Sequence, residues 1–150
     1  MLNGENLASK KPKYVGFWAR LVAYIIDSIA SQIAMIILLL PVILLINNQS
    51  PVMLQIAGIS YALFVIAAVL LAYYVYAESS AWQATLGKKL LGMKVTDLKG
   101  KRISFLRSLG RNLAKILSAI PVDAGYIMIG FTEKKQGLHD MLAGTLVVKR

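Results

Sequence analysis

The sequence predicts an all-α integral membrane protein with two long transmembrane helices, a shorter helical hairpin broken by proline, and a small cytoplasmic β-sheet. Three observations lead to this fold class. The 150 residues are 57% hydrophobic, with a mean hydropathy of +0.63. Only 16% are charged, against about a quarter in a soluble domain. The apolar residues lie in long blocks, as they do in proteins that cross a bilayer.

Charge and cysteine content exclude several classes of function. The formal net charge is +10, which in a soluble protein would suggest nucleic acid as a partner. Here the basic residues flank apolar blocks, so we expect anionic lipid head groups rather than nucleic acid to be their partners. The chain has no cysteine, which excludes disulfides, thiolate metal sites and cysteine nucleophiles.

The first transmembrane helix is expected at about 17–46, after a flexible basic segment at 1–16. This apolar run is far longer than the hydrophobic part of a signal peptide, so we interpret it as a permanent anchor. A helix of that length covers roughly 45 Å, against about 30 Å for the hydrocarbon core. Arg20 is therefore expected at head-group depth and Asp27 about two turns deeper. Pro41 is expected to kink the far end.

The second transmembrane helix is expected at about 52–77, after the uncharged turn "NNQSP". Residues 80–104 then predict an interfacial helix followed by a β-hairpin. In the helix, Ser80 would be the N-cap, apolar residues would face lipid and lysines would face head groups, with Gly92 at the end. "MKVTD" and "KRISF" would form the hairpin, and "GTLVVKR" in the C-terminal tail (132–150) could add a third strand.

The third apolar block, 105–131, allows two interpretations because Pro121 interrupts it. It could be one irregular span, or two shorter helices at 105–120 and 122–131 with Asp123 near their tip. Every basic cluster lies on the cytoplasmic side only if this block crosses the membrane an even number of times. We therefore favour a hairpin partly sheltered by the first two helices, a multi-pass topology, and two cytoplasmic termini.

The charged residues in and near the apolar blocks are the candidate functional residues. A charge at the centre of a membrane helix costs at least about 2.5–3.5 kcal/mol, so such residues usually face protein or water. Asp27 could be a carboxylate that binds a proton or cation, or a buried structural partner for an arginine or for loop amides. Arg20, seven residues earlier, could reach lipid phosphates or meet an acid from elsewhere in the chain.

His139 and Asp140 are adjacent in "GLHDMLAGT", a short segment bounded by glycines. His139 beside Asp140 could relay protons, since histidine titrates near neutrality. The alternative is local: Asp140 would cap a short helix or pair with Arg20. One histidine and no cysteine do not provide a zinc site, and "TLGKK" lacks the first glycine of a phosphate loop. We therefore expect no metal, no cofactor and no catalytic residue.

Three motifs in order resemble the RDD family of bacterial membrane proteins: "FWARLVAYIID", "ATLGKKLLGMKVTD" and "GLHDMLAGTLVV". The resemblance extends from about Tyr14 to Val148. It implies that the arginine and two aspartates for which the family is named are Arg20, Asp27 and Asp140. It also implies a location in the cytoplasmic membrane of a prokaryote. Some family members are linked to sodium–proton exchange.

Two functions follow as hypotheses, and neither is enzymatic. The first is a small cation or proton transporter that uses a polar cluster of Arg20, Asp27, Asp140 and His139. Two spans and a hairpin are few for a transporter acting alone, so this hypothesis favours a homo-oligomer. The second is a non-catalytic scaffold, assembly subunit or lipid-interacting module, in which the cluster is a structural clasp. In both, we expect Arg20 to bridge Asp27 and Asp140.

Overall fold

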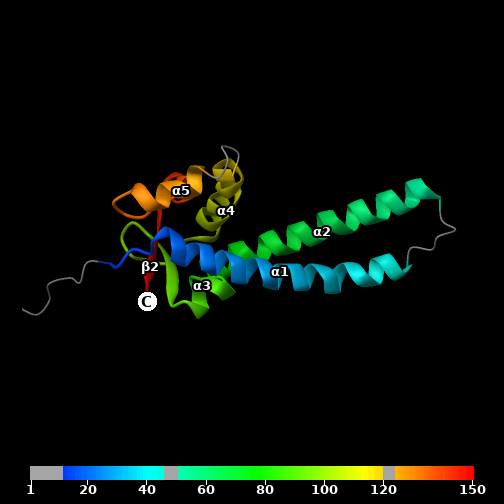
Figure 1. Ribbon diagram of the computed structural model, residues 1–150, viewed down its shortest axis with the longest axis horizontal. Coiled ribbons are helices and arrows are strands. Elements are labelled where there is room, and N and C mark those ends of the chain that lie inside the picture. The colour runs from blue at the N-terminus through cyan, green and yellow to red at the C-terminus, as the bar shows by residue number, and fades with distance from the viewer. Residues whose placement is uncertain (1–11, 46–50, 120–123) are drawn as a thin grey trace, which may run out of the picture.

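Two long helices extend away from the rest of the chain in the computed structural model, which describes residues 12–45, 51–119 and 124–150. They are α1 (Phe17–Leu45) and α2 (Val52–Ser79), and they project together from one end of the molecule (Figure 1). Ser31 and Tyr74 link them through a hydrogen bond of 3.0 Å between their hydroxyl oxygens. Residues 46–50, where most of the predicted turn lies, are outside the described ranges.

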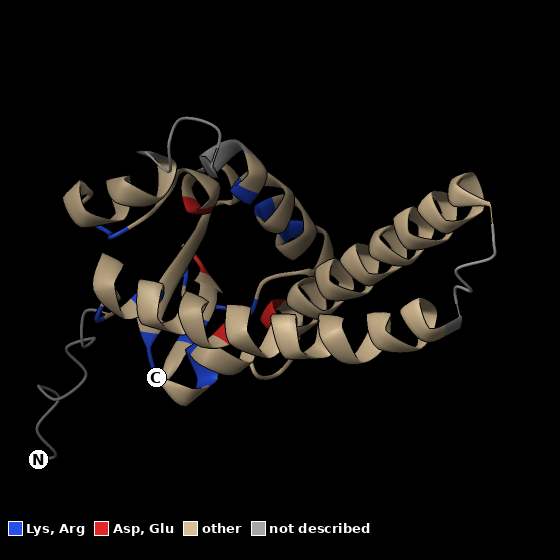
Figure 2. Ribbon diagram, turned by 45° about the vertical axis from the view of Figure 1, so that its right-hand side comes forward, with Lys and Arg blue, Asp and Glu red and all other residues tan. Residues whose placement is uncertain are grey.

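Both helices are long and apolar enough to cross a membrane. Their mean hydropathy is 2.1 over 17–44 and 2.3 over 52–79. Large apolar side chains remain exposed along their whole length, among them Leu44 and Met53 near the far end. Figure 2 shows charged residues only at the end where the other elements gather, while the outer parts of α1 and α2 carry none. An uncovered apolar surface of this extent fits a lipid environment better than water.

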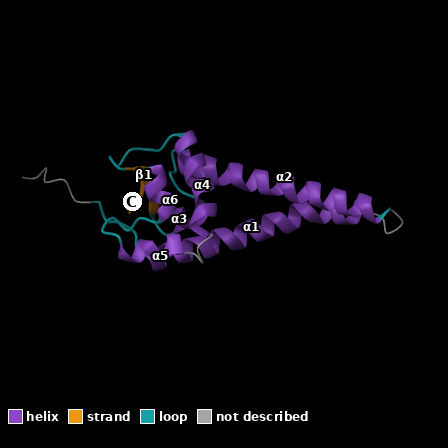
Figure 3. Cartoon of the chain, turned by 90° about the horizontal axis from the view of Figure 1, so that it is seen from above, coloured by secondary structure: helices purple, strands orange, loops and turns teal. Residues whose placement is uncertain are grey.

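The remaining elements gather around the opposite end of the helix pair (Figure 3). In chain order they are α3 (Leu86–Leu90), β1 (Met93–Asp97), α4 (Phe105–Ala119), α5 (Ala124–Phe131), α6 (Leu138–Ala143) and β2 (Thr145–Lys149). We call this group of elements the end domain. A small core of Val15, Ala23, Met93, Val95, Ile103 and Val147 joins it to the first turns of α1.

The sheet has two strands, β1 and β2, which pair antiparallel from Met93 opposite Lys149 to Asp97 opposite Thr145. The residues before α1 lie along the other edge of β2. Val15 donates its backbone N–H to the carbonyl of Val147 at 3.0 Å, and Tyr14 forms an isolated bridge with Val148. The prediction that "TLVV" forms a strand is therefore confirmed, and its position brings both ends of the described chain together.

The predicted hairpin between "MKVTD" and "KRISF" is wrong. The Asp97 carboxylate accepts the backbone N–H groups of Lys99 and Lys101 at 2.9 and 2.8 Å, which closes a tight turn. Arg102 then donates to the carbonyl of Ser79, and Ser104 accepts the N–H of Arg107 at the start of α4. These contacts lead residues 101–104 into a helix, so the third strand of the predicted sheet is not formed.

The predicted interfacial helix at 80–92 is reduced to the five residues of α3. Ser80 follows the C-terminus of α2, where its hydroxyl donates to the carbonyl of Ala77 at 2.8 Å, so it is not the N-cap of a following helix. Gly92 does end α3, with a φ of +65° that glycine adopts readily. Trp82 and Leu90 are exposed as predicted, whereas Lys88 is turned inward.

The third apolar block contains two helices, α4 and α5, and the tip with Pro121 and Asp123 lies outside the described residues. The polar side of α4 faces inward: Ser108, Arg111 and Asn112 are buried. Its apolar side faces outward, with exposed Leu106 and Ile116. This inverted pattern is typical of elements that meet lipid on the outside and place charges against protein.

Candidate functional site

Arg20 and Asp140 form a buried ion pair that joins the first helix to the tail. Arg20 lies in the first turn of α1 and Asp140 in α6, and both side chains are buried. The guanidinium contacts Asp140 through Nη1, donates from Nε to the carbonyl of Val15 at 3.0 Å, and donates from Nη2 to the carbonyl of Lys135. All its nitrogens therefore have partners within the protein.

Arg111 of α4 holds the other side of Asp140. Its Nε and Nη2 atoms each lie 2.8 Å from Oδ1 of Asp140, while Nη1 lies 2.6 Å from Oε2 of Glu78. Arg111 is only 1% exposed and Glu78 is fully buried. Asp140 is thus clamped between two arginines, and the second of them reaches the end of α2.

Three further side chains contact the carboxylate of Glu78. Its Oε1 atom pairs with Lys88 of α3 and lies 3.5 Å from Nζ of Lys115, and its Oε2 accepts from the Asn112 amide at 3.1 Å. We call Arg20, Asp140, Arg111, Glu78, Lys88 and Lys115 the charge network. It connects α1, α2, α3, α4 and α6 in one group of buried or partly buried charges.

The geometry accounts for the ionisation of the network. Burial raises the pKa of Asp140, but Arg111 and Arg20 outweigh it and hold that pKa well below its usual range. Burial lowers the pKa of Arg111, and Glu78 and Asp140 more than compensate, so it is raised overall. Asp140 is therefore ionised at physiological pH and Arg111 always charged, as a permanent structural pair requires.

Asp27 lies outside this network, so the prediction that Arg20 bridges both aspartates is wrong. Asp27 instead accepts the Thr85 hydroxyl at 2.5 Å and the backbone N–H of Gly87 at 2.7 Å. These groups belong to the N-terminus of α3, where helices leave backbone N–H groups unpaired and favour an anion. Arg20 is separated from Asp27 by about two helical turns and its donors are already used.

Gly87 makes the close approach of α3 to α1 possible. A Cβ atom at this position would lie 2.2 Å from the carbonyl oxygen of Ala23 and 3.1 Å from Cγ of Asp27. Only a residue without a side chain fits there. The motif "ATLGKK" thus supplies the donors that bind Asp27, namely the Thr85 hydroxyl and the Gly87 N–H, and at Gly87 it also supplies the contact surface for α1.

His139 is buried beside Asp140 and against Tyr126. Its Nε2 lies 3.6 Å from Oδ1 of Asp140, and its ring centroid lies 4.9 Å from that of Tyr126. Burial lowers the pKa of His139 to about 3, with the nearby cation of Arg111 adding to the effect. The imidazole is therefore neutral at physiological pH, which is poorly matched to a proton relay working near neutrality.

Sequence reasoning identified Arg20, Asp27, Asp140 and His139 but missed Arg111 and Glu78. Both are ionisable residues within or at the end of an apolar block, which is a signal of a buried partner. Arg111 is also in phase with Ser108, Asn112 and Lys115 on one face of α4, at spacings of three and four residues. That polar stripe was visible in the sequence, but its partners were not.

A cavity of about 700 Å³ lies beside the network, between α1, α2, α4 and α5. Its charged lining residues are Arg20, Asp27, Lys88, Arg111 and Lys115. Its apolar walls include Phe17, Leu21, Leu70, Leu71 and Ile127. A cavity with this mixture of apolar walls and convergent polar groups is a candidate ligand site.

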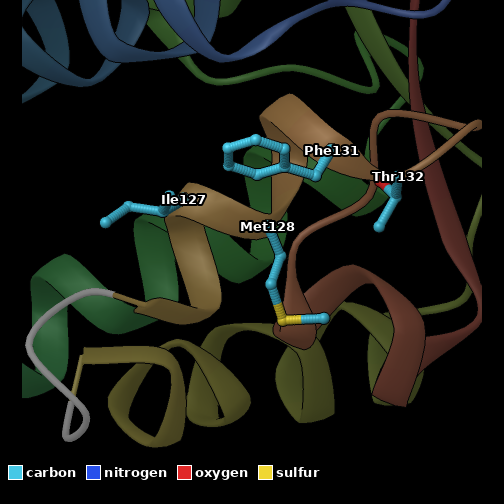
Figure 4. A pocket seen from close by; sticks show the side chains of 4 residues that line it. All are labelled: Ile127, Met128, Phe131 and Thr132. Atoms are coloured by element: carbon cyan, nitrogen blue, oxygen red, sulfur yellow. The ribbon is translucent and has the colours of Figure 1, made fainter.

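A second, smaller pocket of about 250 Å³ lies on α5 and has a different character. Ile127, Met128, Phe131 and Thr132 line it (Figure 4), and none of them carries a charge. Phe131 is 86% exposed. We interpret this pocket as part of the apolar outer surface. Among residues 12–45, 51–119 and 124–150, no cluster of three or more His, Cys, Asp or Glu side chains is placed to hold a metal ion.

The sequence of this chain is similar to those of known proteins. The sequence pattern of the RDD family matches residues 14–144. The uncharacterized protein YxaI of Bacillus subtilis is 38% identical over 153 residues, covering 91% of this chain and 97% of YxaI. The uncharacterized membrane protein YteJ of the same organism is 28% identical over 142 residues, covering 90% of this chain and 80% of YteJ. No solved structure matches the chain.

Proposed function

This chain belongs to the RDD family, and from that premise we propose that it is a non-catalytic module of the cytoplasmic membrane whose arginine and aspartates clasp the end domain onto two transmembrane helices. The observation that carries the proposal is that Arg20, Asp27 and Asp140 all bind other groups of the protein. Arg20 and Asp140 pair across 120 residues of sequence, and Asp27 binds the start of α3. Such contacts fix the arrangement of elements.

The membrane location is supported by three independent features. The described residues include two helices of sufficient length and hydropathy, a related protein is named a membrane protein, and the outer face of α4 is apolar. We propose a multi-pass topology in which α1 and α2 cross the bilayer and the end domain, with both termini, lies on the cytoplasmic side. Lys134, Lys135 and Lys149 in the tail then follow the positive-inside rule.

A double-mutant cycle tests the clasp. Arg20→Ala and Asp140→Ala should each lower the stability of the purified protein by about 3–5 kcal/mol, because each breaks a buried charge pair and leaves the other charge less compensated. The double variant should lose less than the sum, with a coupling of about 0.5–3 kcal/mol. Thermal unfolding in detergent measures these effects. Additive losses with no coupling would contradict the clasp.

A cation or proton transporter is the second candidate, and one observation favours it. Asp27 lines the cavity together with the polar residues Ser28, Ser31 and Gln32, which extend along α1 toward the apolar half of the molecule. In this alternative Asp27 binds the transported ion, and a homo-oligomer completes the pathway. Asp27→Asn separates the two functions in proteoliposomes: loss of flux from a stable variant supports transport, whereas full flux excludes Asp27 as the carrier.

A further inference from the structure

We propose that the cavity between α1, α2 and α4 binds the phosphate head group of an anionic membrane lipid. The inference rests on the proposed membrane location and adds a ligand to it. The observations behind it are an excess of positive charge around the cavity, one cation that is weakly paired, and walls that suit an amphiphile.

The cavity and its surroundings carry more positive than negative charge. Four cations meet there, namely Arg20, Lys88, Arg111 and Lys115. Three carboxylates oppose them: Glu78 and Asp140 in the network, and Asp27 on the cavity wall. Four minus three leaves one net positive charge in a partly buried setting, where an uncompensated charge is costly. One phosphodiester would neutralise it.

Lys115 is the cation with the weakest pairing. Its Nζ has no carboxylate within 3 Å: the nearest described carboxylate oxygen, Oε1 of Glu78, is 3.5 Å away and already binds Lys88. Its close contacts are neutral, the Asn112 side-chain oxygen at 2.6 Å and the ring of Tyr74 at 5.4 Å. Each remaining cation of the network contacts a carboxylate directly: Arg111 and Lys88 contact Glu78, and Arg20 contacts Asp140.

The ionisation of Lys115 agrees with this shortage of negative charge. Burial lowers its pKa to about 8, and although Glu78 and Asp140 raise it, Lys88 and Arg111 lower it further. An anion bound in the cavity would raise this pKa and keep the lysine protonated. Binding should therefore weaken as the pH rises above about 8, where unliganded Lys115 loses its proton.

The walls of the cavity favour a lipid over a free anion. Phe17, Leu21, Leu70 and Leu71 lie on the parts of α1 and α2 that adjoin the basic side chains. They can receive the first carbons of acyl chains, and the polar residues Tyr74 and Asn112 also line the cavity. The volume of about 700 Å³ falls within the usual range for small-molecule sites.

Lipid binding to the purified full chain tests the proposal. In detergent, native mass spectrometry and thermal unfolding would compare short-chain phosphatidylglycerol, phosphatidylcholine of the same chain length, and inorganic phosphate. We expect phosphatidylglycerol to bind and stabilise the protein and the other two to do so far less. Lys115→Gln should weaken that binding at least about tenfold, because it removes a charge-assisted hydrogen bond to the phosphate.

Lys89→Gln is the matched control. This neighbouring lysine lies over the Trp82 ring at 3.4 Å and does not line the cavity, so its removal should leave lipid affinity unchanged. Equal binding of both lipids, an equal effect of inorganic phosphate, or equal losses in both variants would overturn the proposal. Because detergent replaces the bilayer, these outcomes do not depend on topology. A protein that fails to enter the membrane fraction of cells would instead contradict the proposed function.

Discussion

At the scale of the residue, one guanidinium separates two buried acids. Arg111 contacts Glu78 at the end of α2 and Asp140 in α6, with distances of 2.6 and 2.8 Å. Without it, both carboxylates would lose a partner in a poorly solvated interior, where charges interact strongly. Arg111 is therefore as central to the clasp as Arg20 and Asp140.

Replacing Arg111 should be more damaging than replacing any exposed arginine. Arg111→Met keeps the volume but leaves Glu78 and Asp140 without their shared partner, at an expected cost of about 3–5 kcal/mol. Arg107→Met on the same helix is the control: its side chain is 46% exposed and 3.9 Å from Asp97, so the cost should be within about 1 kcal/mol. Thermal unfolding in detergent measures both, and equal losses would contradict the central role of Arg111.

His139 should make stability depend on acidity. Its pKa is lowered from 6.5 to about 3 in the folded protein, so between these values the unfolded chain binds more protons than the folded one. Stability should therefore fall as the pH drops below about 6.5, with a limiting slope of about 1.4 kcal/mol per pH unit. The charged groups around it are Asp140, Arg111, Lys115 and Lys88, and they remain ionised over most of this window.

Unfolding midpoints at pH 7 and pH 5 measure the effect of His139. The wild-type protein should lose stability between the two conditions, while His139→Gln should lose much less because glutamine does not titrate. Asp140 affects the pH dependence only at lower pH. Its pKa is depressed in the folded protein, so the stability that the ionised carboxylate provides is lost only as the pH falls below the usual aspartate pKa. The same pH response in both proteins would show that another group is responsible.

At the scale of the element, contacts at the N-terminus of α3 stabilise this helix, because it is too short to be stable by itself. It has five residues, too few to be stable alone, and Asp27 supplies the acceptor for the Gly87 N–H. The absence of a side chain at Gly87 lets it sit against the carbonyl of Ala23. The position of α3 then brings Lys88 to Glu78, so the contact with Asp27 also sets part of the charge network.

Gly87→Ala should displace α3 from α1. A Cβ atom would lie 2.2 Å from a backbone oxygen, which cannot move without disturbing α1, so we expect a loss of about 1–3 kcal/mol. Gly110→Ala in α4 is the control, because nothing lies within 4 Å of a Cβ atom there and alanine favours the helix. A Gly87→Ala protein as stable as the Gly110→Ala protein would contradict this packing.

Local sequence patterns predicted the long elements well and the pairings poorly. The apolar blocks alone were sufficient for α1 and α2, because hydropathy is a property of each segment by itself. "KRISF" has strand composition, yet the Asp97 turn and the bond from Arg102 to Ser79 lead it into α4. Glu78 and Arg111 escaped assignment since their role depends on partners from other segments. A pair between Arg20 and Asp140 was only one of several alternatives that the local sequence left open, because it joins segments 120 residues apart.

At the scale of the whole molecule, the charged residues that the structure describes lie at one end. α1 beyond Asp27 and α2 before Glu78 carry no charged residue, whereas the end domain holds the charge network and the basic tail. Within the end domain, α4 turns its charged side toward the network and its apolar side outward, with Leu106 and Ile116 exposed. The end domain is expected to rest at the membrane surface rather than stand clear of it.

Reporter fusions test this orientation. A fusion after Arg150 and one within 97–101 should both report the cytoplasm, while one within 47–51 should report the outside. All basic clusters lie on the cytoplasmic side only if α1 and α2 each cross the membrane once and the chain is again on the cytoplasmic side after α4 and α5. An external report from the fusion after Arg150 would mean that the third apolar block crosses once.

The separation of Arg20 from Asp140 has a consequence for synthesis. The two residues are 120 positions apart, and at about 5–20 residues per second the ribosome needs roughly 6–24 seconds to reach the second after the first. Until Asp140 has been synthesised, Arg20 lacks the carboxylate with which it pairs in the folded protein. Asp140 is the last residue of the charge network in chain order, so the network can be completed only after α6 has been synthesised.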